Sequence, residues 1–210
     1  MIQVLIADDH AVVREGIKRI LADTNDIVVT GEAGDGKELM SKIAGGGWDV
    51  VLMDLAMPGT SGLEVLQDIR KQNPQLAVLV LSMYPEDQYA VRTLAAGASG
   101  YVHKGSPPEQ LISAIRTVAG GQRYITTEVA QSLASHVDVV SSKPAHEMLS
   151  NREYQVLCAI ASGKSVSDIA RDLSLSVKTV STYRARLLEK LGLRHNAEIT
   201  RYAIERNLVD

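Results

Sequence analysis

The stretch VVLMDLAMPGTSG, residues 50–62, decides how this sequence can fold. It opens with four apolar residues that run without a break into Asp54, and such short runs are typical of parallel strands covered on both faces. The runs QVLIA, LAVLVLS and GYVH, at residues 3–7, 76–82 and 100–103, also end in or just before a polar residue. Because parallel strands end on the same edge of a sheet, we expect these polar residues to gather there.

Outward from this stretch, the first 125 residues alternate between apolar runs and amphipathic segments. Strands are expected at residues 3–7, 27–32, 50–53, 77–81 and 100–103. Helices are expected where apolar residues recur at helical spacing, at residues 12–23, 36–44, 61–72, 86–96 and 108–119. Because strands and helices alternate with short loops between them, the sequence predicts an α/β fold with a doubly wound, five-stranded parallel sheet.

The C-terminal part is expected to be all-α, with four helices. Ser150 and Glu153 form the pattern of a capping box before the first of them. The helices are expected at residues 152–161, from Ser165 or Ser167 to 173, at 177–191 and at 197–206. The tight turn between the second and third is typical of a helix-turn-helix, whose second helix enters the major groove of DNA.

The net charge also differs between the N-terminal and C-terminal parts of the chain. Residues 1–125 hold 15 acidic and 11 basic side chains, residues 126–147 hold 3 and 1, and residues 148–210 hold 7 and 10. Only the C-terminal segment is basic, in a chain whose net charge is −3, and such asymmetry indicates a module that meets a polyanion. The sequence therefore predicts domains at 1–125 and 148–210, with a linker at 126–147 that begins as a helix.

Composition indicates a globular protein of the cytoplasm. The chain has 210 residues, 45% of them hydrophobic, and a mean hydropathy near zero. It has no run of about 18 apolar residues, as a membrane span requires, and Met1 leads directly into a predicted strand with polar ends, which argues against a signal peptide. The single cysteine, Cys158, cannot form an internal disulfide, which fits a reducing compartment. We therefore expect no membrane association.

The strand-end residues have the chemistry of a site for a cation and a phosphoryl group. Asp8 and Asp9 are adjacent, and with Asp54 they form an acidic cluster that needs a cation or raised pKa values. Mg²⁺ suits such oxygen ligands, and the point charge of Lys104 suits phosphate. Ser82 offers a hydroxyl donor, and Asp54 is the candidate nucleophile. A plainer interpretation, in which Asp9 only caps the following helix, leaves Lys104 unexplained.

The first 125 residues resemble the receiver domain of two-component response regulators, a CheY/flavodoxin-like fold. The motifs that carry the resemblance are LIADDH (5–10), VLMDLAMPGTSG (51–62), VLSMY (80–84) and GYVHKGSPPEQL (100–111). The resemblance implies that a sensor histidine kinase phosphorylates Asp54 of this domain.

The same resemblance implies a role for each strand-end residue. Asp9, Asp54 and the backbone carbonyl of Ala56 would ligate Mg²⁺, and Asp8 would support the ion through a water molecule. Phosphorylation would draw Ser82 and Lys104 inward, and Tyr101 would move into the vacated space. Ser82 and Tyr101 would thus be the switch pair.

Residues 148–210 resemble the LuxR-type helix-turn-helix, through LSNREYQVLCAIASGKSVSDIARDLSLSVKTVSTYRARLLEKLGL at 149–193. Together with the receiver, this is the pattern of a NarL/FixJ-type response regulator, similar to the branch of BvgA and GacA. It implies a transcriptional regulator, not an enzyme, that is a homodimer when active and binds double-stranded promoter DNA. The DNA-contacting residues would be Lys178, Thr179, Ser181, Thr182, Tyr183, Arg184, Arg186 and Lys190.

Three alternatives remain at this point. A haloacid-dehalogenase-like phosphatase also uses a strand-end aspartate and Mg²⁺, but it needs a second acid two residues later, where this chain has Ala56. A ligand-sensing, quorum-type regulator would need a large apolar cavity in its N-terminal domain. A receiver that is never phosphorylated would bind DNA constitutively.

Overall fold

The computed structural model describes residues 1–83, 86–127, 129–130, 145–206 and 208–209. Its internal contacts divide the chain into two compact units, Met1–Ser135 and His136–Asp210. Tyr84, the last residue of the VLSMY motif, lies outside the described residues, as does most of the linker expected at 126–147. No helix within the described ranges is both long enough and apolar enough to cross a bilayer.

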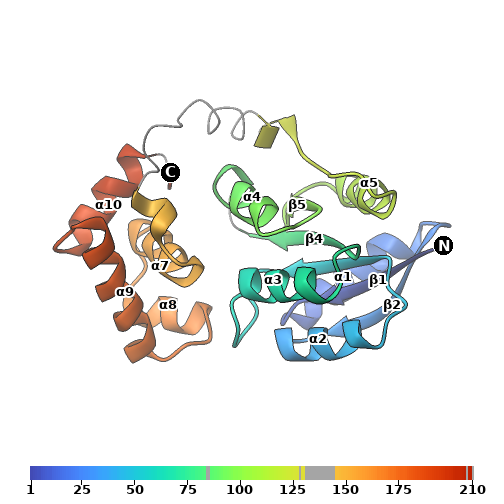
Figure 1. The fold of residues 1–210 in the computed structure, drawn as a ribbon, viewed down its shortest axis with the longest axis horizontal. Coiled ribbons are helices and arrows are strands. Elements are labelled where there is room, and N and C mark those ends of the chain that lie inside the picture. The colour runs from blue at the N-terminus through green and yellow to red at the C-terminus, as the bar shows by residue number, and fades with distance from the viewer. Residues whose placement is uncertain (84–85, 128, 131–144, 207, 210) are drawn as a thin grey trace. The chain divides into compact units, whose positions relative to one another are not determined.

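The first unit contains a five-stranded sheet in which every neighbouring pair is parallel (Figure 1). Its strands are β1 (Ile2–Ala7), β2 (Ile27–Ala33), β3 (Val50–Asp54), β4 (Ala77–Ser82) and β5 (Gly100–His103), in the order β2-β1-β3-β4-β5. Its helices are α1 (Ala11–Ala22), α2 (Gly36–Ala44), α3 (Gly62–Gln72), α4 (Glu86–Ala95) and α5 (Pro108–Ala119). The predicted doubly wound α/β fold is confirmed, with strand and helix ends that differ from the expected ones by one residue at most.

The register of the strands determines which residues meet at the carboxyl edge. Ala7 of β1 pairs with Met53 of β3, so the residues that follow, Asp8 and Asp54, are neighbours. Ser82 of β4 pairs with His103 of β5, so Lys104 begins the loop next to Ser82. The strand order changes direction between β1 and β3, and open α/β sheets place their ligand sites at such a point of the carboxyl edge.

Both faces of the sheet are covered, as the continuous apolar runs indicated. Every residue of β3 and β4 is buried. On one face, alternate strand residues form a single hydrophobic core with Ile17 and Leu21 of α1 and Leu111 and Ile115 of α5. The central strands are therefore held firmly, and their carboxyl ends carry the polar residues on a rigid base.

The outer edge of β5 is partly covered by the chain that leaves α5. The N–H of Tyr124 donates to the carbonyl of Ser99 at 2.9 Å, and Tyr124 forms an isolated parallel bridge with Gly100. A Cβ on Gly100 would lie 2.8 Å from the Cβ of Tyr124, so only glycine permits this approach. The segment that follows α5 is therefore attached to the strand that carries Tyr101.

The second unit is all-α in its described residues, as predicted. A 3₁₀ turn, η1 (Ala145–Met148), precedes α7 (Asn151–Ala161), α8 (Val166–Asp172), α9 (Val177–Leu191) and α10 (Asn196–Glu205). A serine side chain caps each of the first three α-helices by accepting a hydrogen bond from the backbone N–H three residues later. These N-cap residues are Ser150, Ser165 and Ser176. Ser174 has a φ of 53°, and this left-handed residue makes the tight turn between α8 and α9.

Candidate acidic site and nucleic-acid interface

Lys104 bridges two aspartates at the carboxyl edge of the sheet. Its Nζ lies 2.6 Å from Oδ2 of Asp8 and 2.7 Å from Oδ2 of Asp54. The side chains of Lys104, Asp8 and Asp54 are 11%, 2% and 3% exposed. Three residues that are far apart in the sequence thus form one nearly dry ionic group, in which the ammonium offsets part of the negative charge.

Asp9 and His10 form the exposed rim of this group. Asp9 is 26% exposed, and Nδ1 of His10 lies 2.9 Å from Oδ1 of Asp9 and 3.2 Å from Oδ1 of Asp8. The backbone N–H of His10 also donates to Asp8, at 2.8 Å. His10 was not among the predicted site residues, although its place directly after the two aspartates was a usable signal.

The buried charges shift the pKa values of this group. Burial raises the pKa of the Asp54 carboxyl, and nearby Asp8 raises it further, whereas Lys104 acts in the opposite direction. For Lys104, burial favours the neutral amine, but the pairs with Asp54 and Asp8 outweigh it and raise its pKa. The ionised carboxylate of Asp54 is therefore at a higher free energy here than in water, and Lys104 remains charged.

The donor set fits a divalent cation. Ligand atoms of Asp8, Asp9, His10 and Asp54 all lie within 4.8 Å of one another. Carboxylate oxygens are the ligands that Mg²⁺ prefers, and excess negative charge favours a cation. The backbone N–H of Ala56 donates to the Asp54 carboxylate, so the main chain at Ala56 approaches the same oxygens.

Ser82 and Tyr101 are both inside the fold. Ser82 is 0% exposed and Tyr101 is 1% exposed, and Tyr101 pairs with Val80 of β4. Tyr101 is the residue predicted to move into the space vacated by Ser82 and Lys104 upon phosphorylation, and in this structure it is buried. The carbonyl of Ser82 accepts from the N–H of Lys104 at 2.8 Å, which joins the ends of β4 and β5 beside the acidic group.

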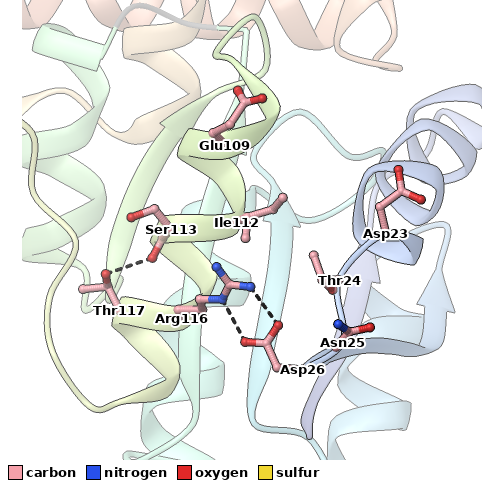
Figure 2. Close-up of a pocket in the computed structure, with 9 residues that line it drawn as sticks. All are labelled: Asp23, Thr24, Asn25, Asp26, Glu109, Ile112, Ser113, Arg116 and Thr117. Atoms are coloured by element: carbon pink, nitrogen blue, oxygen red, sulfur yellow. Dashed lines mark hydrogen bonds and ion pairs between the residues drawn. The ribbon is translucent and has the colours of Figure 1, made fainter.

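A separate pocket of about 590 Å³ lies between the α1–β2 loop and α5. Figure 2 shows the guanidinium of Arg116 facing the carboxylate of Asp26 across it, with two contacts of 2.8 Å. Its lining includes neither the acidic group nor Ser82 or Tyr101. This pocket is therefore distinct from the site that the sequence predicted.

In the second unit, α9 has an apolar face and an exposed polar face. Val180 and Leu187 are 0% exposed and face the core. The side chains of Lys178, Ser181, Thr182, Arg186 and Lys190 are exposed, and those of Thr179, Tyr183 and Arg184 are half-buried. All eight predicted DNA-contacting residues therefore belong to one helix and lie outside its buried stripe.

Two of these eight residues bond to other helices of the unit. Nε of Arg184 donates to Oδ1 of Asn196 in α10 at 2.5 Å. Nζ of Lys190 lies 2.7 Å from Oε2 of Glu153 in α7. The sequence offered no signal for either contact, because the partner residues are far away in the chain.

Comparisons with known proteins agree with this architecture. A family model described as "Response regulator receiver domain" matches residues 4–116, and one described as "Bacterial regulatory proteins, luxR family" matches residues 147–203. Response regulator UvrY of Escherichia coli (strain K12) is 40% identical over 209 residues, 99% of this chain and 96% of that protein. Response regulator GacA of Pseudomonas syringae pv. syringae (strain B728a) is 41% identical over 212 residues, 100% of this chain and 99% of that protein.

Solved structures of RcsB, one of them from Salmonella enterica serovar Typhimurium, are similar as well. RcsB bound to promoter rprA in the presence of phosphomimetic BeF3− is 27% identical, covers 96% of this chain and 97% of that chain, and has a TM-score of 0.64. A structure of two RcsB dimers bound to two parallel DNAs is 28% identical, covers 96% of each chain, and has a TM-score of 0.59. The family match confirms the prediction that the chain is a regulator rather than an enzyme. The chain belongs to the NarL/FixJ-type response regulators, in the branch of GacA and BvgA, and joins a receiver domain to a LuxR-type DNA-binding domain.

Proposed function

We propose that this chain is a phosphorylation-dependent transcriptional regulator. Asp54 accepts a phosphoryl group from a sensor histidine kinase, and the phosphorylated chain forms a homodimer that binds promoter DNA. The observation that carries the proposal is the setting of Asp54. Its carboxylate, 3% exposed, ends the central strand β3 and contacts the buried ammonium of Lys104. A carboxylate with a nearby fixed cation is equipped to receive a phosphoryl group.

In the proposed reaction, a carboxylate oxygen of Asp54 attacks the phosphorus of a phosphohistidine. The new bond is an acyl phosphate, and the bond from phosphorus to the imidazole nitrogen breaks. The imidazole leaves with the electron pair and takes up a proton from solvent. Lys104 stabilises charge on the phosphoryl oxygens, because its ammonium already lies 2.7 Å from the acceptor carboxylate.

We propose that Asp9, Asp54 and the carbonyl of Ala56 hold Mg²⁺ in this site, with Asp8 supporting it through a water molecule. When bound, the ion supplies positive charge that offsets both the carboxylates and the incoming phosphoryl oxygens. Asp9 suits a direct ligand because it is the most exposed aspartate of the group. Asp8 is 2% exposed and already accepts from Lys104 and from the backbone of His10.

The proposed switch passes from Asp54 through Ser82 and Tyr101. A phosphoryl group adds about −1.5 to −2 charge at neutral pH, if it resembles other phosphorylated residues. Ser82 and Lys104 respond to this charge, and β5 with Tyr101 repacks next to them. Turning a mostly inactive population into a mostly active one requires roughly 5.5 kcal/mol of differential stabilisation. Dimerisation on two half-sites contributes part of it.

The output is proposed to be major-groove binding by α9. Lys178, Ser181, Thr182 and Arg186 have exposed side chains of the types that reach phosphates and base edges. Thr179, Tyr183 and Arg184 border this face. We propose domain limits of 1–125 and 148–210, with residues 126–147 as the linker, and we propose that the protein acts in the cytoplasm, where its promoter targets are.

A Phos-tag gel after incubation with acetyl phosphate and Mg²⁺ tests the input. The wild-type chain should give a shifted band, and Asp54→Ala should give none. Asp23→Ala, which removes an exposed aspartate at the end of α1, is the matched control and should shift like wild type. A shifted band from Asp54→Ala would show that the phosphoacceptor is a different residue.

A DNA-selection experiment tests the output. Double-stranded fragments recovered from a random library by the phosphorylated wild-type chain should bind more weakly without the phosphodonor, and binding by Asp54→Ala should not respond to it. Equal binding with and without phosphodonor would instead support a receiver that does not control its DNA-binding domain.

A further inference from the structure

One oxygen of Glu153 joins two helices of the second unit. Its Oε2 accepts from the backbone N–H of Ser150 at 2.7 Å and contacts Nζ of Lys190 at 2.7 Å. Glu153 is only 3% exposed, whereas the Lys190 side chain is 41% exposed. The start of α7 and the last turn of α9 are therefore linked through a single buried carboxylate.

The buried Glu153 carboxylate depends on the ammonium group of Lys190. A nearly buried charge without a partner is strongly destabilising, so removing one member of such a pair disturbs the other. Glu153 also closes the capping box with Ser150, so its position is fixed from both sides. Burial favours the neutral acid, but the contacts with Lys190 and Ser150 outweigh it and hold the pKa of Glu153 below its usual value. Lys190 is thus paired with a carboxylate that remains ionised.

The position of Lys190 along α9 also matters. Twelve residues separate Lys178 from Lys190, which corresponds to about 18 Å along the helix axis. In helix-turn-helix proteins the N-terminal residues of the second helix contact the base edges, and the major groove is only about 12 Å wide. A helix that inserts its first turns therefore carries Lys190 away from the groove.

We propose that Lys190 is a positioning residue for DNA binding: it holds α9 against α7 through Glu153, and it does not contact a DNA phosphate. The inference rests on the proposed DNA-binding function and deepens it. It also replaces the role that the sequence pattern gave to Lys190. Because Ser150 directly follows the turn η1 and Leu149, the same carboxylate links the entry of the unit to its recognition helix.

The salt dependence of DNA affinity distinguishes a lysine that contacts a phosphate from one that only positions α9. A lysine that neutralises a phosphate contributes about 0.9 to the slope of log K against log salt, and a positioning residue contributes nothing. The full phosphorylated chain is titrated, at several salt concentrations, against a labelled duplex that the wild type selects from a random library. The temperature is one at which circular dichroism shows every variant fully folded.

Four single variants and one double variant are compared. Lys190→Met should weaken binding by roughly threefold to tenfold, a coupling typical of contacting residues, and leave the salt slope unchanged. Lys190→Arg, which can still reach Glu153, should restore the affinity. Lys178→Met is the matched control on the same helix and should lower the slope by about 0.9. In the Glu153→Gln background, which keeps an acceptor for the N–H of Ser150, a further Lys190→Met change should have little effect.

The outcomes that overturn the inference are specific. If Lys190→Met lowers the salt slope as Lys178→Met does, or weakens binding equally in the Glu153→Gln background, Lys190 contacts DNA directly. If Lys190→Met is folded and binds as tightly as wild type, the pair is only structural. A wild-type chain that selects no duplex overturns the proposed function and this inference with it, whereas the other outcomes overturn the inference alone.

Discussion

The ammonium of Lys104 lies 2.7 Å from the carboxylate of Asp54, although β4 separates the strands that lead to these two residues. Neighbouring strands are about 4.8 Å apart, so the lysine side chain extends across the end of β4 to reach its partner. Lys104 therefore occupies part of the space in which a cation would be attracted to the carboxylates. It supports the site and competes with the ion.

Replacing Lys104 should make the fold dependent on Mg²⁺. Lys104→Met leaves Asp8 and Asp54 buried without their cation, so we expect a loss of roughly 3 kcal/mol in unfolding free energy in EDTA. Millimolar Mg²⁺ should recover most of this loss, because a ligand that binds only the native state stabilises it. Thermal unfolding in EDTA and in Mg²⁺ measures both effects.

The control for Lys104→Met is Lys71→Met, which removes an exposed lysine paired with Asp68. It should change stability by less than about 0.5 kcal/mol under either condition. If Mg²⁺ raised the melting temperature of Lys104→Met no more than that of wild type, the competition between lysine and ion would be excluded.

Neutralising Asp54 should stabilise the apo protein. Burial raises the pKa of this carboxyl, so its ionised form is unfavourable in the fold at neutral pH. Asp54→Asn should therefore increase the unfolding free energy in EDTA, because the amide side chain does not bear the cost of a buried negative charge. Urea unfolding followed by Trp48 fluorescence measures the change, and Asp23→Asn should have almost none.

The advantage of Asp54→Asn should depend on pH with a definite sign. Above the raised pKa of the folded state, wild type carries the full cost of the buried charge. As the pH falls toward about 3.9, the usual value for aspartate, Asp54 takes up its proton in the folded protein before it does so in the unfolded chain. The difference between the two proteins should shrink over this window and vanish below it. A difference that grows as the pH falls would mean that the folded pKa is lowered, not raised.

Two glycines should respond in opposite ways to alanine. A Cβ on Gly62 would lie 2.6 Å from Cα and 2.7 Å from the carbonyl oxygen of Leu55, beside Asp54, so Gly62→Ala should cost about 2 kcal/mol. Gly16 is exposed within α1, where a Cβ has open space, so Gly16→Ala should add roughly 0.5–1 kcal/mol. Urea denaturation ranks the variants, and stabilisation of Gly62→Ala would contradict the close packing of the β3–α3 loop.

Two substitutions at Ser176, the N-cap residue of α9, should affect stability and DNA binding differently. Ser176 accepts from the N–H of Thr179 at 3.0 Å, so Ser176→Ala should cost about 1 kcal/mol. Ser176→Asp keeps the cap and the stability, but it adds negative charge where α9 is proposed to meet DNA. We expect it to weaken binding several-fold in fluorescence anisotropy. Binding by Ser176→Asp as tight as wild type would place the start of α9 away from the DNA.

The strand ends could be predicted from the sequence because strand direction alone brings them together. Continuous apolar runs identified β3 and β4, and parallel order then placed Asp54 and Lys104 on one edge. Helix caps at Ser150 and Ser176 were equally accessible, since each depends on residues three positions apart. Local spacing and strand direction therefore account for the fold and for the main residues of the acidic site.

What escaped prediction depends on contacts between distant residues. The pairing of Lys190 with Glu153 joins residues 37 positions apart, and a basic residue on a recognition helix has the same pattern whether it contacts a carboxylate or DNA. Sequence patterns identify the helix face; tertiary packing decides which of its charges already have partners.

The bridge between Tyr124 and Gly100 has a consequence for anyone who transplants this receiver onto another output. A fusion junction placed at Ala119, where α5 ends, would discard the bridge from Tyr124 to Gly100 and expose more of the β5 edge, which favours aggregation. A junction placed after Tyr124 keeps this part of the edge covered and keeps the chain attached next to Tyr101. The segment that must be transferred with the receiver domain therefore extends beyond its last helix.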